Sequence, residues 1–235
     1  MYYIKIDMNT QQKETTDPEY YRTLLEQKLT AMFHSESSGH DMYHLERVYN
    51  LSLHIQQKEG GDRLVIGIAA LLHDVHRLME KTSGSFVHPK DSHPVIEKLL
   101  KDIQFPPEKI PTVLHCIQYH EEYGFSKQGK TVQDIETLIL QDADNLDAIG
   151  AIGIGRTFTF GGAHNVPMWN PKKPFDRKHY DESGTDHSTL HHFYSKLLRL
   201  TDNMNTETAK RLARDRHEYM AVFVKQFTNE WNGKL

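Results

Sequence analysis

A short stretch of the sequence, AALLHDVHR at residues 69–77, begins like a buried helix and then places His73 beside Asp74. A buried carboxylate is costly unless a hydrogen-bonding partner or a counterion compensates for it. Histidine is the commonest metal ligand among the side chains. Neighbouring helical residues point about 100° apart, so this pair can bind one ion only where the buried part of the helix ends.

Two other segments bury a potential ligand where the pattern calls for an aliphatic residue. His44 belongs to a helical stripe at positions 44, 48, 51 and 55, and Asp142 ends a stripe at positions 135, 138, 139 and 142. Each has a structural alternative, a satisfied core histidine or a carboxylate that caps a backbone. One divalent cation held by His44, His73, Asp74 and Asp142 explains all three segments at once. Two neutral imidazoles and two carboxylates neutralise a dication and leave positions for water or phosphate.

The elements that position these residues are predicted to be helices throughout. Apolar spacing and capping signals indicate helices at residues 18–34, 41–58, 62–79, 93–102, 107–122, 131–149, 187–201 and 205–231. Residues 153–176 start helical and become a long loop rich in glycine, proline and aromatic residues. We expect an all-α helical bundle, with additional C-terminal helices that form a cap or a lateral bundle.

Composition limits the classes of function. The chain has 235 residues and a net charge of −4, which argues against a large nucleic-acid interface. No apolar run approaches the roughly 20 residues that span a bilayer, and the N-terminal residues lack the pattern of a signal peptide. A single cysteine, Cys116, excludes a disulfide framework and suits the cytoplasm. Sixteen histidines favour a metal site.

The order His44, His73-Asp74, Asp142 resembles the H…HD…D signature of the HD superfamily of metal-dependent phosphohydrolases. The segments GHDMYHLERVYNLS, AALLHDVHR, LILQDADNLDAIGAIGIGRTF and STLHHFYSKLLRLTDNMNTETAKRLARDRHEYM are similar to a bacterial group of stand-alone HD-domain hydrolases. The resemblance implies an HD phosphohydrolase domain over residues 37–235, with residues 1–36 as a helical extension packed on it. It also implies one Mn²⁺-like ion, with Mg²⁺, Co²⁺, Ni²⁺, Fe²⁺ or Zn²⁺ as alternatives, and hydrolysis of a phosphate ester or anhydride, often in a nucleotide.

Phosphoryl transfer needs a metal, cationic groups for the phosphate oxygens and a positioned acid or base. We assign catalytic roles to Asp74, His73 and Arg47, although a helix-surface ion pair is an equal alternative for Arg47. Asp147 could orient a ligand histidine by accepting a hydrogen bond from the ring nitrogen that does not bind the metal. The predicted substrate contacts are Lys196, His192, Arg156, His120 and Arg77.

Two features near the signature need separate interpretation. Members of the group often carry an acidic residue where Arg77 stands, so the substrate of this chain could differ from theirs. The earlier dipeptide His40-Asp41 opens a helix, where Asp41 is a good N-cap and His40 is expected to be exposed.

The leading hypothesis is a metal-dependent phosphohydrolase that acts on a nucleotide or a similar small phosphorylated compound. One alternative is a nucleotide-sensing or binding module that keeps the metal without turnover. Another is an oxygenase with two irons on the same fold, which needs extra ligands such as His93 and His120. No membrane or nucleic-acid partner is expected, and the sequence leaves the oligomeric state, a monomer or a homodimer, open.

Overall fold

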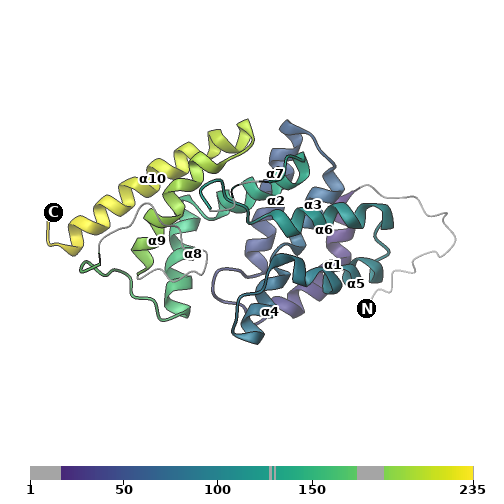
Figure 1. Ribbon diagram of the computed structural model, residues 1–235, viewed down its shortest axis with the longest axis horizontal. Helices are drawn as coiled ribbons and strands as arrows, with labels where there is room; N and C mark the ends of the chain where they lie inside the picture. Colours follow the sequence, from purple (N-terminus) through teal and green to yellow (C-terminus); the bar gives the residue numbers. More distant parts are fainter. Residues whose placement is uncertain (1–16, 127–128, 130, 174–187, 235) are drawn as a thin grey trace, which may run out of the picture.

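In the computed structural model, residues 17–126, 129, 131–173 and 188–234 are described, and these residues form helices and no strand (Figure 1). The predicted all-α class is therefore confirmed. The α-helices are α1 (Pro18–Phe33), α2 (Met42–Glu59), α3 (Arg63–Leu72), α4 (Val75–Ser83), α5 (His93–Asp102), α6 (Ile110–Tyr119), α7 (Ile135–Asp147), α8 (Gly150–Ala163), α9 (Thr189–Ser195) and α10 (Glu207–Trp231). Short 3₁₀ helices are η1 (Pro89–Ser92), η2 (Pro107–Lys109) and η3 (Leu197–Asn203).

Helix α3 forms the centre of the bundle. Its residues 64–72 are all buried, because α1, α2, α6 and α7 pack around it. Gly67 permits the closest approach, since a Cβ there would lie 2.9 Å from Pro18 and 3.1 Å from Tyr49. Helix α1 adds Leu25 and Leu29 to the same core. The C-terminal end of α3 consequently lies inside the protein, which is where a buried site can form.

Helix boundaries differ from the prediction in two places that affect the site. The helix expected over 62–79 is two helices, α3 and α4, separated at residues 73 and 74. The helix expected over 131–149 begins only at Ile135 and ends at Asp147, and the chain then turns at Gly150, whose φ is +76°. Helix α8 follows and extends to Ala163, further than the sequence indicated. Residues 174–187, where the long loop was expected to end and the next helix to begin, lie outside the described residues.

The C-terminal helices form a lateral bundle, one of the two arrangements that the sequence predicts, and α8 is part of it. Helices α8, α9 and α10 lie to one side of α1–α6 in Figure 1, while α10 also contacts α2 and α7. The rings of Phe158, Phe193, Phe223 and Phe227 hold this bundle together, with centroids 5.7 to 6.1 Å apart. Such tilted aromatic pairs stabilise packing beyond the burial of their area.

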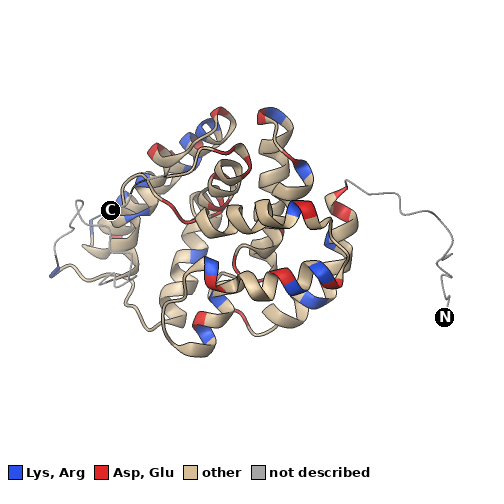
Figure 2. Cartoon of the chain, turned by 45° about the vertical axis from the view of Figure 1, so that its right-hand side comes forward, with Lys and Arg blue, Asp and Glu red and all other residues tan. Residues whose placement is uncertain are grey.

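The surface carries charges of both signs. Acidic and basic residues are interspersed along the helices (Figure 2), in keeping with the near-balanced composition. Within the described part of the chain, none of the helices has the length and apolar character required to span a membrane.

Candidate metal centre

The break between α3 and α4 places His73 and Asp74 inside the protein. His73 ends α3 in the helical conformation, and Asp74 follows with φ −94° and ψ 11°, a sparsely populated region often found at active sites. Both side chains are buried. The break in the helix lets the side chains of these two adjacent residues face one point, which a continuous helix would not allow.

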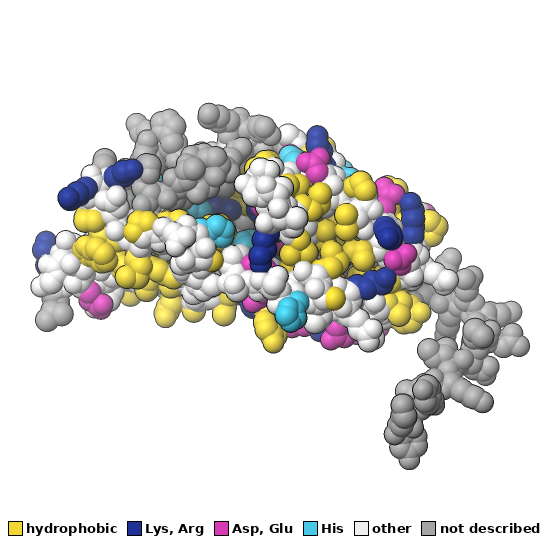
Figure 3. Space-filling view, turned by 90° about the horizontal axis from the view of Figure 1, so that it is seen from below, with side chains coloured by type: hydrophobic (Ala, Val, Ile, Leu, Met, Phe, Trp, Pro, Cys, Tyr) yellow, Lys and Arg dark blue, Asp and Glu magenta, His cyan; other side chains and the backbone are white. Residues whose placement is uncertain are grey.

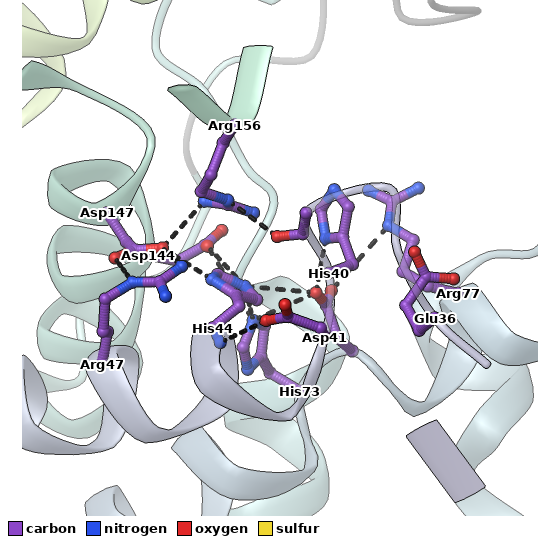
Figure 4. Close-up of polar contacts among 12 residues, drawn as sticks. Glu36, His40, Asp41, His44, Arg47, His73, Arg77, Asp144, Asp147 and Arg156 are labelled. Carbon is purple, nitrogen blue, oxygen red and sulfur yellow. Dashed lines mark hydrogen bonds and ion pairs between the residues drawn. The ribbon is translucent and has the colours of Figure 1, made fainter. Parts of the chain in front are cut away.

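Four ligand atoms from three parts of the chain meet beside this break (Figure 4). The Nε2 atom of His44, on α2, lies 3.2 Å from Nε2 of His73, 3.2 Å from Oδ2 of Asp74 and 3.5 Å from Oδ1 of Asp144. His73 Nε2 lies 3.6 Å from the Asp74 oxygen and 3.8 Å from the Asp144 oxygen. A cation with bonds of about 2.0–2.2 Å keeps adjacent ligand atoms roughly 3 to 3.5 Å apart. The five distances are close to those expected between ligands of one cation, and His44, His73 and Asp144 form one of the groups of described residues that could hold it.

The predicted ligand Asp142 points elsewhere, and the structure brings Asp144 to the cluster in its place. The Asp142 carboxylate accepts hydrogen bonds from the backbone N–H and amide of Asn205, at 2.8 and 2.9 Å, and from the N–H and hydroxyl of Thr206, at 2.8 and 2.7 Å. These donors satisfy its buried charge. Asp144 is two residues further along α7, on another face, and retains 19% of its side-chain exposure.

A second carboxylate of α7 orients His44, as the sequence suggested for Asp147. His44 Nδ1 lies 2.8 Å from Asp147 Oδ2, and the acceptor-only carboxylate makes this nitrogen the donor. The tautomer leaves the Nε2 lone pair directed at the cluster. Burial raises the pKa of Asp147, but the hydrogen bonds from His44 and Arg47 lower it by more, well below its usual range. This is the carboxylate–histidine arrangement common behind metal ligands.

Arg47 and Arg156 both bind Asp147. Arg47 donates to the two carboxylate oxygens at 2.7 and 3.0 Å, and Arg156 Nη1 lies 3.0 Å from Oδ2. Arg47 therefore forms an ion pair, which was the alternative considered for it. Its partner is Asp147 on α7, and not a residue of its own helix α2. Both guanidiniums also line a shallow pocket of about 280 Å³, whose other walls are Ser37, Gly39, Asp41, Ala151, Ile152, Gly155 and Thr159.

His73 is held as a neutral ligand. Its Nδ1–H donates to the carbonyl of Ala70 at 2.8 Å, which leaves Nε2 as the lone-pair atom in the cluster. Burial lowers the pKa of His73 by more than the neighbouring carboxylates Asp74 and Asp144 raise it. Neutral imidazole is the form that binds a metal ion.

His120 extends the cluster on the side away from Asp147. Its ring centroid lies 5.1 Å from that of His73, and it could share a cation with His73 and Asp74. Nδ1 donates to the carbonyl of Ile117 at 2.6 Å, whereas the buried Nε2 has no hydrogen-bond partner in the described structure. Among the described residues, His93 is in none of the groups that could hold an ion.

Arg77, near His120, forms ion pairs with carboxylates. It donates to Glu80 at 2.8 Å and to Glu121, and its Nε lies 3.8 Å from Asp74 Oδ1. Burial lowers the pKa of Arg77, but Glu121 and Asp74 raise it by more. Burial raises the pKa of the Glu121 carboxyl, but nearby positive charges lower it by more. Arg77 has the largest effect among them, and Lys196 has a smaller one. Both groups therefore stay ionised.

The two predicted contacts from the C-terminal bundle lie around α9. His192 is half-buried on that helix, and Lys196 ends it. The Lys196 ammonium lies 4.5 Å from the centre of the Tyr123 ring, a cation–π contact. Seen from below, the molecule is hollowed between the two helical groups, and histidine and basic side chains reach the surface there (Figure 3).

Besides Asp144, His40 is a member of the cluster that the sequence did not predict. His40 was expected to be exposed, but its side chain is only 24% exposed and its Nδ1 lies 2.6 Å from Asp74 Oδ2. Asp41, by contrast, is the N-cap that the sequence predicts, accepting from the N–H of His44 at 2.9 Å. The dipeptide pattern alone could not show that residues 34–41 fold back across the site.

Comparisons with known proteins identify the family. The HD domain family matches residues 42–149. YpgQ from Bacillus subtilis (strain 168) is 36% identical over 221 residues, which are 94% of this chain and 97% of YpgQ. A Lactobacillus plantarum crystal structure aligns with a TM-score of 0.78 and 29% identity, covering 92% of this chain and 99% of that one.

A crystal structure of an HD-superfamily hydrolase from Bacillus thuringiensis has a TM-score of 0.67 and 35% identity, covering 93% of this chain and all of its own (100%). YpgQ in complex with ADP has a TM-score of 0.65 and 32% identity, covering 91% and 97% of the two chains. The chain belongs to the HD domain family, and it is a hydrolase of the HD superfamily.

Proposed function

We propose that this protein is a metal-dependent phosphohydrolase that acts on a nucleotide or a similar small phosphorylated compound. The observation that carries the proposal is the convergence of two imidazoles and two carboxylates, from three parts of the fold, at distances of 3.2 to 3.8 Å. The crystal structure of the relative YpgQ with ADP favours a nucleotide. The single buried cysteine, Cys116, favours the cytoplasm as the place of action.

The proposed ligands are His44, His73, Asp74 and Asp144, and the proposed ion is Mn²⁺. Two neutral imidazoles and two carboxylates balance the charge of a dication, and mixed nitrogen and oxygen ligands suit Mn²⁺ and its neighbours in the series. When bound, such an ion supplies Lewis-acid polarisation of a phosphate oxygen and a more acidic water. Asp147 holds His44 in the tautomer that this role requires.

Other side chains, in the cluster and on α9, suit an anionic substrate. Lys196, whose charge acts on Glu121 beside the cluster, and His192 on the same helix would supply positive charge or N–H donors, and we assign them to phosphate oxygens. His120 is kept neutral because burial lowers its pKa. Its Nε2 carries the lone pair and can accept a hydrogen bond from water or from a substrate hydroxyl.

The arginines act mainly through carboxylates in this proposal. Arg47 and Arg156 neutralise Asp147 and so fix the support behind His44. Arg77 neutralises Glu121, which would otherwise repel a phosphate beside the cluster. Part of the Arg77 side chain remains exposed, at 28%, and can still face a substrate.

A hydrolysis assay tests the function. The full-length protein is incubated with Mn²⁺ and a panel of nucleoside mono-, di- and triphosphates, and phosphate and pyrophosphate are measured separately. We expect release of one product from at least one nucleotide, dependence on Mn²⁺, and loss of release in Asp74→Ala. The product identifies whether an ester or an anhydride is cleaved. Binding of Mn²⁺ and nucleotide without release of either product would contradict the proposal and favour a binding module.

A further inference from the structure

The connection between α1 and α2 lies across the metal centre. It is held at three points by three other parts of the chain: Lys81 of α4 donates to the carbonyl of Ser35, Arg156 of α8 donates to the carbonyl of Gly39 at 2.8 Å, and His40 contacts Asp74. Gly39 has a φ of +101°, a conformation that favours glycine. The backbone that carries His40 is therefore fixed independently of the His40 ring itself.

The contact of His40 falls on the oxygen of Asp74 that faces the cluster. Nδ1 of His40 lies 2.6 Å from Asp74 Oδ2, and the same oxygen lies 3.2 Å from His44 Nε2. An ionised carboxylate only accepts hydrogen bonds, so His40 is the donor. A carboxylate oxygen has more than one lone-pair direction, and it can accept this bond while it serves as a ligand.

The two oxygens of Asp74 have different neighbours. Oδ2 faces His40 and His44, while Oδ1 lies 3.8 Å from Arg77 Nε. Asp74 sits in the break between helices and lacks a side-chain capping bond there. The contact from His40, at 2.6 Å, is the shortest of these, so it bears most directly on how the carboxylate plane is turned.

We propose that His40 is a positioning residue, which holds Asp74 Oδ2 in the orientation of a metal ligand through its Nδ1–H. The inference rests on the proposed function, because it takes Asp74 as a ligand. His40 acts through Asp74, so its effect is on metal affinity first and on hydrolysis only through the metal.

Calorimetric titration of the metal-free, full-length protein with Mn²⁺ tests the role without any substrate. Partners of metal ligands typically contribute 10–100-fold to metal affinity, so we expect His40→Ala to weaken Mn²⁺ binding by about that factor. In His40→Asn the amide N–H can take the place of Nδ1–H, and we expect affinity within about threefold of the wild type. In His40→Gln the amide lies further out, near the place of Nε2, and affinity should stay low. His34→Ala changes an exposed histidine before the same connection and should have no effect.

The titrations can overturn the positioning role of His40 in two ways. Wild-type affinity in His40→Ala would overturn the inference and leave the proposed function standing. Affinity in His40→Asn as low as in His40→Gln would also overturn it, because the donor would then not be what matters. If His40→Ala does not fold, the Asn and Gln pair alone gives the answer. Absence of Mn²⁺ binding by the wild type would overturn both proposals.

Discussion

Two faces of α7 carry carboxylates, Asp142 and Asp144, whose charges are compensated in different ways. Asp142 faces the start of α10, where N–H and O–H groups of Asn205 and Thr206 satisfy its charge. Asp144 faces imidazole nitrogens of His44 and His73 at 3.5 and 3.8 Å. The first site is complete as a set of donors and acceptors. Around Asp144, the lone pairs of the carboxylate and of the two imidazole nitrogens face one another. Only protons or a cation can remove the repulsion between them.

The comparison shows why burial alone does not identify a metal ligand. Thr206 is the N-cap of α10, so the Asp142 carboxylate lies where the helix dipole and the free N–H groups favour a negative charge. Asp142 therefore joins α7 to α10, and its role is structural. Asp144 has no such helix end before it and faces the open side of the bundle.

The largest expected effect separates these two residues by activity. Asp144→Asn removes a proposed ligand and should lower Mn²⁺-dependent hydrolysis on the order of 1,000-fold, about 4 kcal/mol in the barrier. Asp142→Asn should retain hydrolysis within about tenfold when assayed well below its unfolding temperature. Values of kcat/KM for both variants at saturating Mn²⁺ provide the measurement. The reverse order would restore Asp142 as the ligand.

Stability should show the opposite order. In Asp142→Asn the ionised acceptor of four hydrogen bonds is lost, and buried charged hydrogen bonds of this kind are worth on the order of 2–4 kcal/mol together. Urea denaturation in the presence of a chelator should show this loss. Asp144→Asn should stay within about 1 kcal/mol of the wild type, since it removes a carboxylate that no cation compensates. Equal stability of Asp142→Asn and the wild type would contradict a structural role.

The sequence could predict the helical fold and the burial of His44, His73 and Asp74, but not which face of α7 turns toward them. Stripes of aliphatic residues placed His44 and the end of α3 in the interior, where the structure has them, because each of those stripes points to one core. Helix α7 is buried nearly all round, from Ile139 to Asp147. Periodicity identifies the exposed face of a helix, and where no face is exposed it cannot assign neighbours. Asp142 and Asp144 are both polar residues in such a helix.

The position of His40 in the site could not be predicted either, because it depends on contacts between distant parts of the chain. Its contact with Asp74 joins residues 34 positions apart, and it exists because Lys81 and Arg156 hold the connection in between. Local signals at Asp41 predict the helix start and nothing of this fold-back. The surroundings of a residue can be predicted from sequence where a single helix determines them. They cannot be predicted in this way where three separate parts of the chain meet, as they do at His40.

A smaller effect should come from the carboxylate behind the centre. Asp147→Asn weakens the hold on His44 Nδ1–H, and we expect Mn²⁺ affinity to fall about 10–100-fold. Arg47→Lys keeps the charge but loses the paired hydrogen bonds to Asp147, so we expect a fall of less than about tenfold. Calorimetric titration with Mn²⁺ measures both. An unchanged affinity in Asp147→Asn would show that His44 needs no support.

The smallest effect belongs to the carboxylate at the exposed end of α7. Asp134 is the N-cap and accepts from the N–H and hydroxyl of Thr137 at 3.0 and 2.6 Å. Asp134→Ala should cost about 1 kcal/mol at neutral pH, as lost caps do, while Asp134→Asn should cost much less. Neither variant should change Mn²⁺ affinity.

The pH dependence of that cap has a definite sign. Burial raises the pKa of Asp134, but the bonds from Thr137 lower it by more, so the folded-state pKa lies below the ordinary value of 3.8. The stabilisation is complete above the unfolded pKa and is lost as pH falls through the folded one. Denaturation curves should therefore separate wild type from Asp134→Ala at pH 7, begin to converge below about pH 4, and coincide only below the folded-state pKa. A difference that persists at lower pH would mean that packing, and not the ionised cap, stabilises this end of α7.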